Sequence, residues 1–316
     1  MHPAKSVIIF TTLSGAGYGL LFMLILGQFL GFYETTLMIE IIGHSLAFVM
    51  VSIGLLSSTF HLGHPERAWR ALSQWRSSWL SREGICSLTT FVFWFFYALY
   101  RFLINEESSA NTMQLLMGSL AILLAALTVF TTSMIYRSLK AVQSWYNVYV
   151  PPLYLLFSLT SGLMLLNVIL QLSQTPSDEI NKLALVTLIA TILLKRGYWR
   201  FIENAPRRST IESATGLGKF GKVSALESPH SHQNYLMAEM GFQVARKHSK
   251  KLKQIFSLLF SIAILAIGVV TLGLMATVMT TVMAFVGFIA MSLAIVVERW
   301  LFFAEARHDQ ALYYGQ

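Results

Sequence analysis

Long apolar runs separated by polar connections make up most of this chain. A helix that crosses a bilayer needs about 20 consecutive, mostly apolar residues. Backbone groups in lipid must be hydrogen-bonded within their own segment, so each run is expected to be a helix and not part of an open sheet. The sequence therefore predicts an all-α polytopic membrane protein, a single integral membrane domain over residues 1–316. Its transmembrane helices, about eight, are predicted at residues 6–30, 36–60, 84–105, 112–136, 150–172, 180–200, 255–278 and 281–303.

Composition supports this fold class. Only 12% of the residues are charged, whereas a soluble domain carries about 25%, so most of the surface is expected to face lipid. The single cysteine, Cys86, excludes a disulfide framework and a Cys-ligated iron–sulfur cluster within this chain. The first apolar run lacks a small-residue cleavage site and is expected to be a retained helix.

Basic residues are distributed unevenly between the two predicted faces. With eight spans, the N-terminus, the even-numbered connections and the C-terminus share one side. Only Arg101 and Lys182, of 23 Lys and Arg residues, lie on the other side. The positive-inside rule then predicts that both termini are cytoplasmic. The connection 201–254 becomes a long cytoplasmic loop. The opposite side carries Glu34, Glu40, Glu106, Glu107, Asp178 and Glu179.

The most informative connection is STFHLGHPERAWRALSQWRSSWLSREG, residues 58–84. The second helix is expected to end at His61, because Gly63 and Pro65 follow. A short amphipathic helix should come next, with Trp69 and Trp75 on one side and arginines elsewhere. Such a helix lies at the headgroup level, so residues 61–83 are interpreted as an interfacial amphipathic connection. Ser81 is expected to cap the third helix, with Glu83 in its first turn.

This connection brings protonatable side chains to the cytoplasmic membrane boundary. Quinol oxidation releases two protons with two electrons, so a quinol site needs an acceptor for each proton. A histidine can accept one near neutral pH, and a carboxylate slightly inside the membrane can accept the other. The structural alternative is that the histidines only end a helix, and that Glu83 pairs with Arg82 or stabilises a helix N-terminus. The candidate quinol or quinone site comprises His61, His64, Arg67, Arg82 and Glu83.

Other candidate pairs favour structural roles. Glu40 and His44 are four residues apart and can touch on one helix face, as a structural pair or, less favoured, a proton entry. Glu298, beside Arg299 and slightly inside the last helix, could line a pocket, but snorkelling or pairing with Arg299 is favoured. Gly15 and Gly19 predict a close helix–helix contact.

Haem is not expected. The only histidines in or at spans, His44 and His61, share one helix and cannot ligate the same iron. There is no metal-ligand spacing, phosphate-binding glycine loop or nucleophile constellation. If the chain handles quinone, a partner must take the electrons.

Four stretches carry a resemblance to a known family, and HLG-x-P followed by S-x-E is the most diagnostic pair. The chain resembles, over essentially its whole length, the DmsC family. These are membrane-anchor subunits of DMSO reductase and related molybdopterin oxidoreductases; NrfD-type anchors share the broad design. The stretches are HPAKSVIIFTTLSGAGYG, STFHLGHPERAWRALSQWRSSWLSREG, SWYNVYVPP and LESPHSHQNYLMAEMGFQVARKH.

The resemblance implies a function. Such anchors hold a molybdopterin catalytic subunit and a four-cluster iron–sulfur subunit at the inner membrane of a bacterium. They connect the pool of menaquinone or ubiquinone to those clusters and carry no cofactor of their own. The His of HLG and the Glu of S-x-E belong to the quinol site, here His61 and Glu83. Arg67 or Arg82 is then expected to hold Glu83 ionised or steer the partner. The loop and the short interfacial helix would form the docking surface.

Three alternatives remain. The cytoplasmic placement of the site also resembles the anchor of quinone-reducing sulfite dehydrogenases, in which electrons run the other way. A secondary transporter would show repeats and a polar site near the midplane, and neither is evident. A purely structural anchor would leave quinone binding to its partner.

Overall fold

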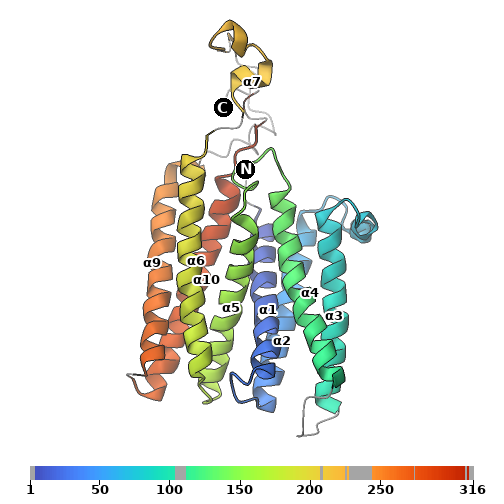
Figure 1. Cartoon of the computed structure of the whole chain (residues 1–316), viewed down its shortest axis with the longest axis vertical. Coiled ribbons are helices and arrows are strands. Elements are labelled where there is room, and N and C mark those ends of the chain that lie inside the picture. The colour runs from blue at the N-terminus through green and yellow to red at the C-terminus, as the bar shows by residue number, and fades with distance from the viewer. Residues whose placement is uncertain are drawn as a thin grey trace.

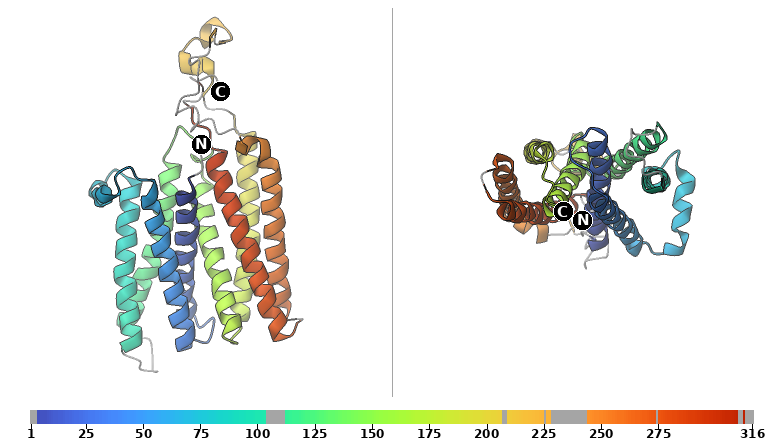
Figure 2. Two further views of the ribbon diagram at one scale, coloured as in Figure 1. Left: turned by 180° about the vertical axis from the view of Figure 1, so that it is seen from behind. Right: turned by 90° about the horizontal axis from the view of Figure 1, so that it is seen from below.

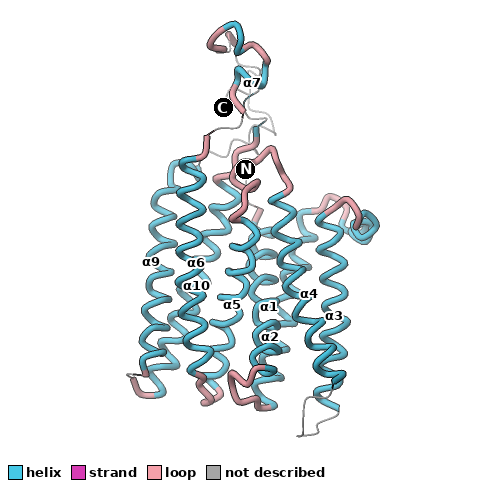
Figure 3. The backbone as a smooth tube through the Cα atoms, viewed as in Figure 1, coloured by secondary structure: helices cyan, strands magenta, loops and turns pink. Residues whose placement is uncertain are grey.

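The protein is a bundle of long helices (Figure 1). The computed structural model describes residues 4–103, 112–206, 209–224, 226–227, 244–273, 275–309 and 312, without the side chains of His61 and of residues 244–247. Its described part contains no strand, only one isolated bridge between Val142 and His308 (Figure 3). The predicted all-α fold is therefore confirmed. The long helices are α1 (Lys5–Phe29), α2 (Leu37–Ser57), α3 (Trp79–Leu103), α4 (Thr112–Arg137), α5 (Val150–Leu172), α6 (Asp178–Asn204), α9 (Val244–Leu272) and α10 (Thr277–Ala304).

Seven of these helices are long and apolar enough to cross a membrane, which makes this a multi-pass membrane protein. α6 does not reach that apolarity, although its length of 27 residues lies between the 23 of α5 and the 29 of α9. It packs between α5 and α9 along their length, and it carries Lys195, Arg196 and Arg200 toward its C-terminal end. The first residues of α1 and the last residues of α10 lie at the same end of the bundle (Figure 1).

Local sequence explains where several helices begin. The hydroxyl of Thr36 accepts a hydrogen bond from the backbone N–H of Ile39, and Ser177 does the same for Ile180. Two prolines stand in the first turn of α5, where a missing N–H costs nothing. Asp178 and Glu179 complement the N-terminal dipole of α6.

The helices form two groups of four, α1 to α4 and α5, α6, α9, α10, and the central contact joins α1 to α5 (Figure 2). The predicted small-residue contact of α1 is confirmed at this place. A Cβ on Gly19 would overlap the carbonyl group of Ser158, and one on Gly162 would overlap the backbone of Gly19. The Ser158 hydroxyl also donates a 2.6 Å hydrogen bond to the carbonyl of Gly15.

Three predicted boundaries differ from the structure. α3 begins at Trp79, before the predicted residue 84. The basic stretch before residue 255, whose sequence is typical of a helix start at the membrane interface, is the first part of α9, so this helix begins well before the predicted span. The predicted 201–254 loop instead contains the end of α6, the short helix α7 (Ile211–Thr215) and the turn η3 (Gly218–Phe220); residues 228–243 lie outside the described part.

The interfacial connection is helical, as predicted, but of the 3-10 type. It comprises η1 (Ser58–His61), which ends α2, and η2 (Pro65–Gln74), which lies at the edge of the bundle against α3 (Figure 2). None of the residues of η2 is buried, and the rings of Trp69 and Trp75 are exposed.

The effect of the close α1–α5 contact on stability can be tested with two glycines of α1, because a Cβ would meet α5 at Gly19 but not at Gly15. We expect Gly19→Ala to lower the free energy of unfolding by about 1–3 kcal/mol, because the new methyl group meets α5 backbone that has no room to yield. Gly15→Ala is the matched control, since a Cβ there meets nothing within 4 Å and the gain in helix propensity is the same. Thermal melting of the detergent-solubilised protein checks this. Equal melting temperatures for the two variants would show that the contact does not constrain the fold.

Candidate functional site

A stripe of polar side chains on α3 faces the interior of the first helix group. Glu83, Ser87 and Thr90 recur at helical spacing, so they share one face. Glu83 is only 4% exposed, and its Oε1 accepts a hydrogen bond from the hydroxyl of Thr132 on α4. Ser87 and the Tyr18 hydroxyl of α1 are 2.8 Å apart. The stripe therefore places a carboxylate inside the bundle, close to the end where both termini lie.

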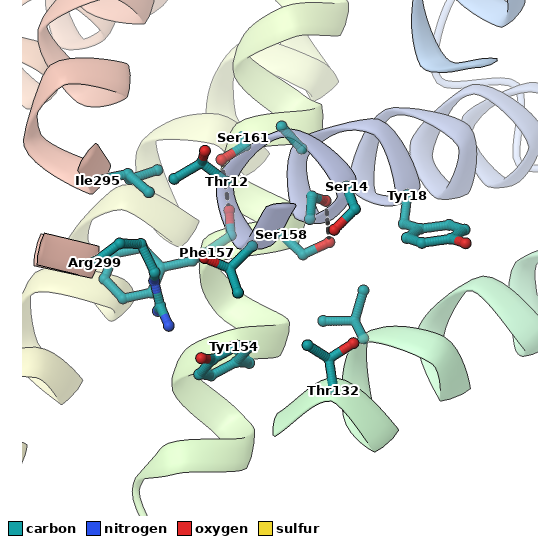
Figure 4. A pocket seen from close by; sticks show the side chains of 14 residues that line it. Thr12, Ser14, Tyr18, Thr132, Tyr154, Phe157, Ser158, Ser161, Ile295 and Arg299 are labelled. Carbon is teal, nitrogen blue, oxygen red and sulfur yellow. Dashed lines mark hydrogen bonds between the residues drawn. The ribbon is translucent and has the colours of Figure 1, made fainter. Parts of the chain in front are cut away.

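A small interhelical cavity lies beside this carboxylate, where α1, α4, α5 and α10 meet (Figure 4). Its wall is rich in hydroxyl groups and includes one cation, Arg299. In this view Arg299 approaches from the left and Thr132 from the right, with Tyr154 below (Figure 4). The volume of about 20 Å³ is room for about one water molecule. The polar residues lining it are Thr11, Thr12, Ser14, Tyr18, Thr132, Tyr154, Ser158, Ser161 and Arg299.

An apolar groove of about 170 Å³ adjoins the interhelical cavity. The two share Tyr18, Val129 and Ser158 as lining residues. The groove continues between α4 and α5 along small and aliphatic side chains, and its remaining lining residues are Gly19, Phe22, Ala125, Ala126, Leu155 and Leu159. An apolar groove with the hydroxyl-bearing side chains of Tyr18 and Ser158 in its wall suits the hydrocarbon tail of an amphiphile whose polar head lies near those hydroxyls.

Deep in the second helix group, three charged side chains form a buried cluster. Lys195 of α6 places Nζ 2.5 Å from Oε1 of Glu298, and Nε of Arg299 lies 2.8 Å from Oε2 of the same carboxylate. Lys195 and Glu298 are each 1% exposed and Arg299 is 3% exposed. The predicted Glu298–Arg299 pair is therefore confirmed, and the snorkelling alternative is wrong. Lys195 was missed. The only hint in the sequence is a lysine within the least apolar of the long helices.

Comparison with known proteins decides the family. The family model described as "DMSO reductase anchor subunit (DmsC)" matches residues 1–315. The chain belongs to the DmsC family. It is also 28% identical over 334 aligned residues to a sulfite dehydrogenase subunit of Allochromatium vinosum, and the alignment covers 99% of each chain. No solved structure matches it. As a DmsC-family protein the chain is a membrane-anchor subunit of an oxidoreductase.

The structure separates the predicted site residues of this DmsC-family anchor. Glu83 is buried, whereas His64, just before η2, and Arg67, on η2, are exposed and both approach Glu66, at 3.0 Å and 3.7 Å. Arg82 stacks on the Trp79 ring and donates hydrogen bonds to the carbonyls of Trp75 and Arg76. His61 ends η1, and its side chain lies outside the described part.

These placements change two predictions. The prediction that Arg67 or Arg82 holds Glu83 ionised is not supported, because each arginine makes its contacts elsewhere. Ser81 is not a cap either. It lies inside α3, which starts two residues earlier, and its hydroxyl donates to the carbonyl of Ala71, so it ties η2 to α3.

Glu40 and His44 were expected to touch, but each has another partner. The carboxylate of Glu40 pairs with Arg101 at 2.8 Å and accepts a hydrogen bond from Gln28. Nδ1 of His44 accepts a 3.0 Å hydrogen bond from the indole N–H of Trp94 on α3. Both side chains thus link helices of the DmsC-family bundle, in keeping with the structural role that was favoured. The described part contains no group of three or more metal-ligating side chains.

The Thr132 hydrogen bond can be tested directly. We expect Thr132→Val to lower the free energy of unfolding by about 1–3 kcal/mol, because the buried Glu83 carboxyl loses its donor. Thr131→Val is the matched control. Thr131 is also buried on the same helix, but its hydroxyl bonds only to the helix's own carbonyls. Melting curves of the two purified variants are compared, and a loss of the same size in both would contradict a specific role of the Thr132 bond.

Proposed function

We propose that this anchor binds quinol beside Glu83 and connects the quinone pool to the iron–sulfur subunit of its complex. The observation that carries the proposal is the position of Glu83. It is a buried carboxylate inside the membrane domain, and its hydroxyl partner, Thr132, lines a small polar cavity that shares lining residues with an apolar groove. Carboxylates within a membrane domain are rare and are associated with proton transfer.

The chemistry follows from what quinol must lose. Oxidation of one quinol to quinone releases two electrons and two protons. Glu83 accepts one proton from a quinol hydroxyl, and His61, the family's second site residue, accepts the other. The electrons leave to the iron–sulfur partner, because carboxylate and imidazole groups only hold and move protons. In the reverse direction the same two groups return protons to quinone.

The apolar groove gives the quinol a route from the bilayer. Ala125 and Ala126 on α4 and Leu155 and Leu159 on α5 form its walls, so an isoprenoid tail can lie there while the head group turns toward Tyr18. Both menaquinol and ubiquinol carry such a tail. His64, Arg67 and Arg82, on or beside the exposed η2 segment, would then contact the partner and not the quinol.

The partners are a molybdopterin catalytic subunit and a four-cluster iron–sulfur subunit. We place them at the bundle end where α1 begins and α10 ends, on the cytoplasmic face of a bacterial inner membrane, where basic residues are concentrated. Exposed tryptophans and arginines on η2 and just after it support docking there: guanidinium groups lie over the rings of Trp69 and Trp75 at 5.6 Å and 5.3 Å. Tryptophan and arginine are enriched at protein interfaces.

Two substrate assignments are open to the complex. The family description names a DMSO reductase, and the Allochromatium relative is named as part of a sulfite dehydrogenase. We propose the DMSO reductase-like assignment first and the sulfite dehydrogenase-type anchor as the second candidate. Both are compatible with the same anchor, because the direction of electron flow depends on the potentials of the partner's clusters and substrate.

The site assignment predicts that Glu83→Gln and His61→Leu abolish quinol-linked turnover while the complex still assembles. The amide cannot accept the proton from quinol, and leucine removes the imidazole. Glu66→Gln is the control, because this carboxylate lies on the same connection but is exposed on η2. Turnover is measured with a quinol analogue in membranes, and assembly by co-purification. Wild-type turnover in either site variant would refute its role.

The partner assignment needs a separate experiment. The tagged anchor is purified in mild detergent, co-purifying proteins are identified by mass spectrometry, and quinol-analogue binding is measured. A molybdenum subunit and a ferredoxin-like subunit, with binding lost in His61→Leu, are the expected result. A solitary protein without quinone affinity would favour the transporter hypothesis instead.

A further inference from the structure

The exposed face of α6 ends in two arginines. Val186, Ile189 and Leu193 recur at helical spacing on this face, and their side chains are exposed. Arg196 and Arg200 continue the same face toward the bundle end where α1 begins and α10 ends, and both are exposed (Figure 1). An exposed apolar face of a membrane helix lies against acyl chains, and arginines near the end of such a helix extend to the lipid headgroups. The two guanidinium groups therefore lie at the level of the headgroup phosphates.

Neither arginine has a counter-charge within the described part of the chain. No described carboxylate or hydrogen-bond acceptor contacts Arg196 or Arg200. Glu203, three residues beyond Arg200, pairs instead with Nζ of Lys253 on α9 at 3.1 Å. Lys195 differs, because it points into the bundle and has its carboxylate partner on α10. The inward cation of α6 is thus neutralised within the bundle, and the two outward ones leave room for an anion from the surroundings.

An open groove of about 660 Å³ lies beside Arg200, between the start of α5 and the end of α6. Side-chain donors from Tyr149, Arg200 and Asn204 line it, and none of its described lining residues carries a carboxylate. The Tyr149 hydroxyl and the Asn204 amide have no hydrogen-bond partner among the described residues. A groove that offers three donors and a positive charge suits an anion whose oxygens only accept hydrogen bonds.

The walls of this groove are held in place by contacts within the protein. The ring of Tyr149 packs against Phe201, with centroids 5.6 Å apart, and a Cβ at Gly197 would lie 3.3 Å from that ring. The absence of a side chain at Gly197 therefore lets the Tyr149 ring lie close to the α6 backbone. Gln143, on the connection between α4 and α5, donates a 2.6 Å hydrogen bond to the carbonyl of Pro206, just beyond α6. The donors are thus positioned before a ligand arrives.

We propose that this groove binds the headgroup of an anionic phospholipid. The phosphodiester accepts hydrogen bonds from Arg200, Tyr149 and Asn204, and Arg196 contributes a second positive charge. An acyl chain of the lipid continues along the apolar face that ends at Leu193. Because the two arginines have no counter-charge, a net negative headgroup such as that of phosphatidylglycerol is favoured over a zwitterionic one. Basic pockets between membrane helices hold such headgroups.

Two observations favour a lipid over an acidic segment of a partner subunit. The arginines continue an apolar face into the groove, so a ligand with both a phosphate and an acyl chain fits the whole of it. The groove also lies away from η2, because η2 packs against α3, and α3 and α6 stand on opposite flanks of the bundle (Figure 1). The inference goes beyond the quinol proposal and does not depend on Glu83.

The first test compares two lipids on the purified protein, kept in a mild detergent with any subunits that co-purify. Short-chain phosphatidylglycerol or phosphatidylcholine is added in increasing amounts. A ligand that binds only the folded protein raises its melting temperature with concentration, which gives an apparent affinity. We expect phosphatidylglycerol to act at concentrations about tenfold below those that phosphatidylcholine requires. Equal effects of the two lipids would overturn the assignment of an anionic headgroup.

Variants locate the site. Arg200→Gln should weaken phosphatidylglycerol binding about tenfold, the loss expected for a hydrogen bond between charged groups, and Tyr149→Phe should weaken it about fivefold while keeping the ring. Lys140→Gln is the matched control, because it removes one exposed positive charge on the connection between α4 and α5 but does not line the groove. Its affinity should stay near the wild-type value. Wild-type affinity in Arg200→Gln, or an equal loss in Lys140→Gln, would overturn the site.

Two further measurements separate a lipid from other anions. Inorganic phosphate supplies the same acceptor oxygens without acyl chains, so it should not displace phosphatidylglycerol at equal concentration; full displacement would overturn the assignment of a lipid. Co-purification of partner subunits should be unchanged in Arg200→Gln. If this variant kept its lipid affinity but lost its partners, the groove would be a docking surface for protein and the lipid proposal would be wrong.

Discussion

The close contact of α1 with α5 is the constraint on which the rest of the structure depends. Gly19 and Gly162 let the two backbones approach with no side chain between them, and Ser158 bonds to the Gly15 carbonyl across the contact. Lipid is as apolar as the helices, so helix association in a membrane relies on such packing and hydrogen bonds. Without it, the two groups of four helices would have no close central contact.

This contact also determines where the polar residues meet. The interhelical cavity lies along the same stretch of α1 and α5, bounded by Thr132 from the first group and Arg299 from the second. Thr132, the hydrogen-bond partner of the Glu83 carboxylate, and the cation Arg299 thereby face one small polar space, although they are far apart in sequence. The geometry of the candidate site is therefore a product of the whole bundle and not of the HLG and S-x-E motif alone.

Much of the fold can be predicted from the apolar runs. Six of the eight long helices have both ends within a few residues of those predicted, because length and apolarity alone determine a span. The start of α3 was missed, since an amphipathic turn continues this helix into the interface beyond its apolar part; the basic stretch that begins α9 was recognised as a helix start but not counted in the predicted span. Glu83 was identified from its motif and its family resemblance. Its partner Thr132, and the pairing of Lys195 with Glu298, depend on contacts between helices far apart in sequence, which no local pattern contains.

The same reasoning explains why the least apolar long helix belongs in the bundle. α6 carries Lys195 inward, and an unpaired lysine at that depth would oppose its insertion. Glu298 of α10 offsets much of that penalty, because its carboxylate lies 2.5 Å from Nζ of Lys195 and 2.8 Å from Nε of Arg299. The least apolar long helix is therefore joined to α10 by a buried charge cluster, and removing one partner of that cluster would leave an uncompensated charge inside the second helix group.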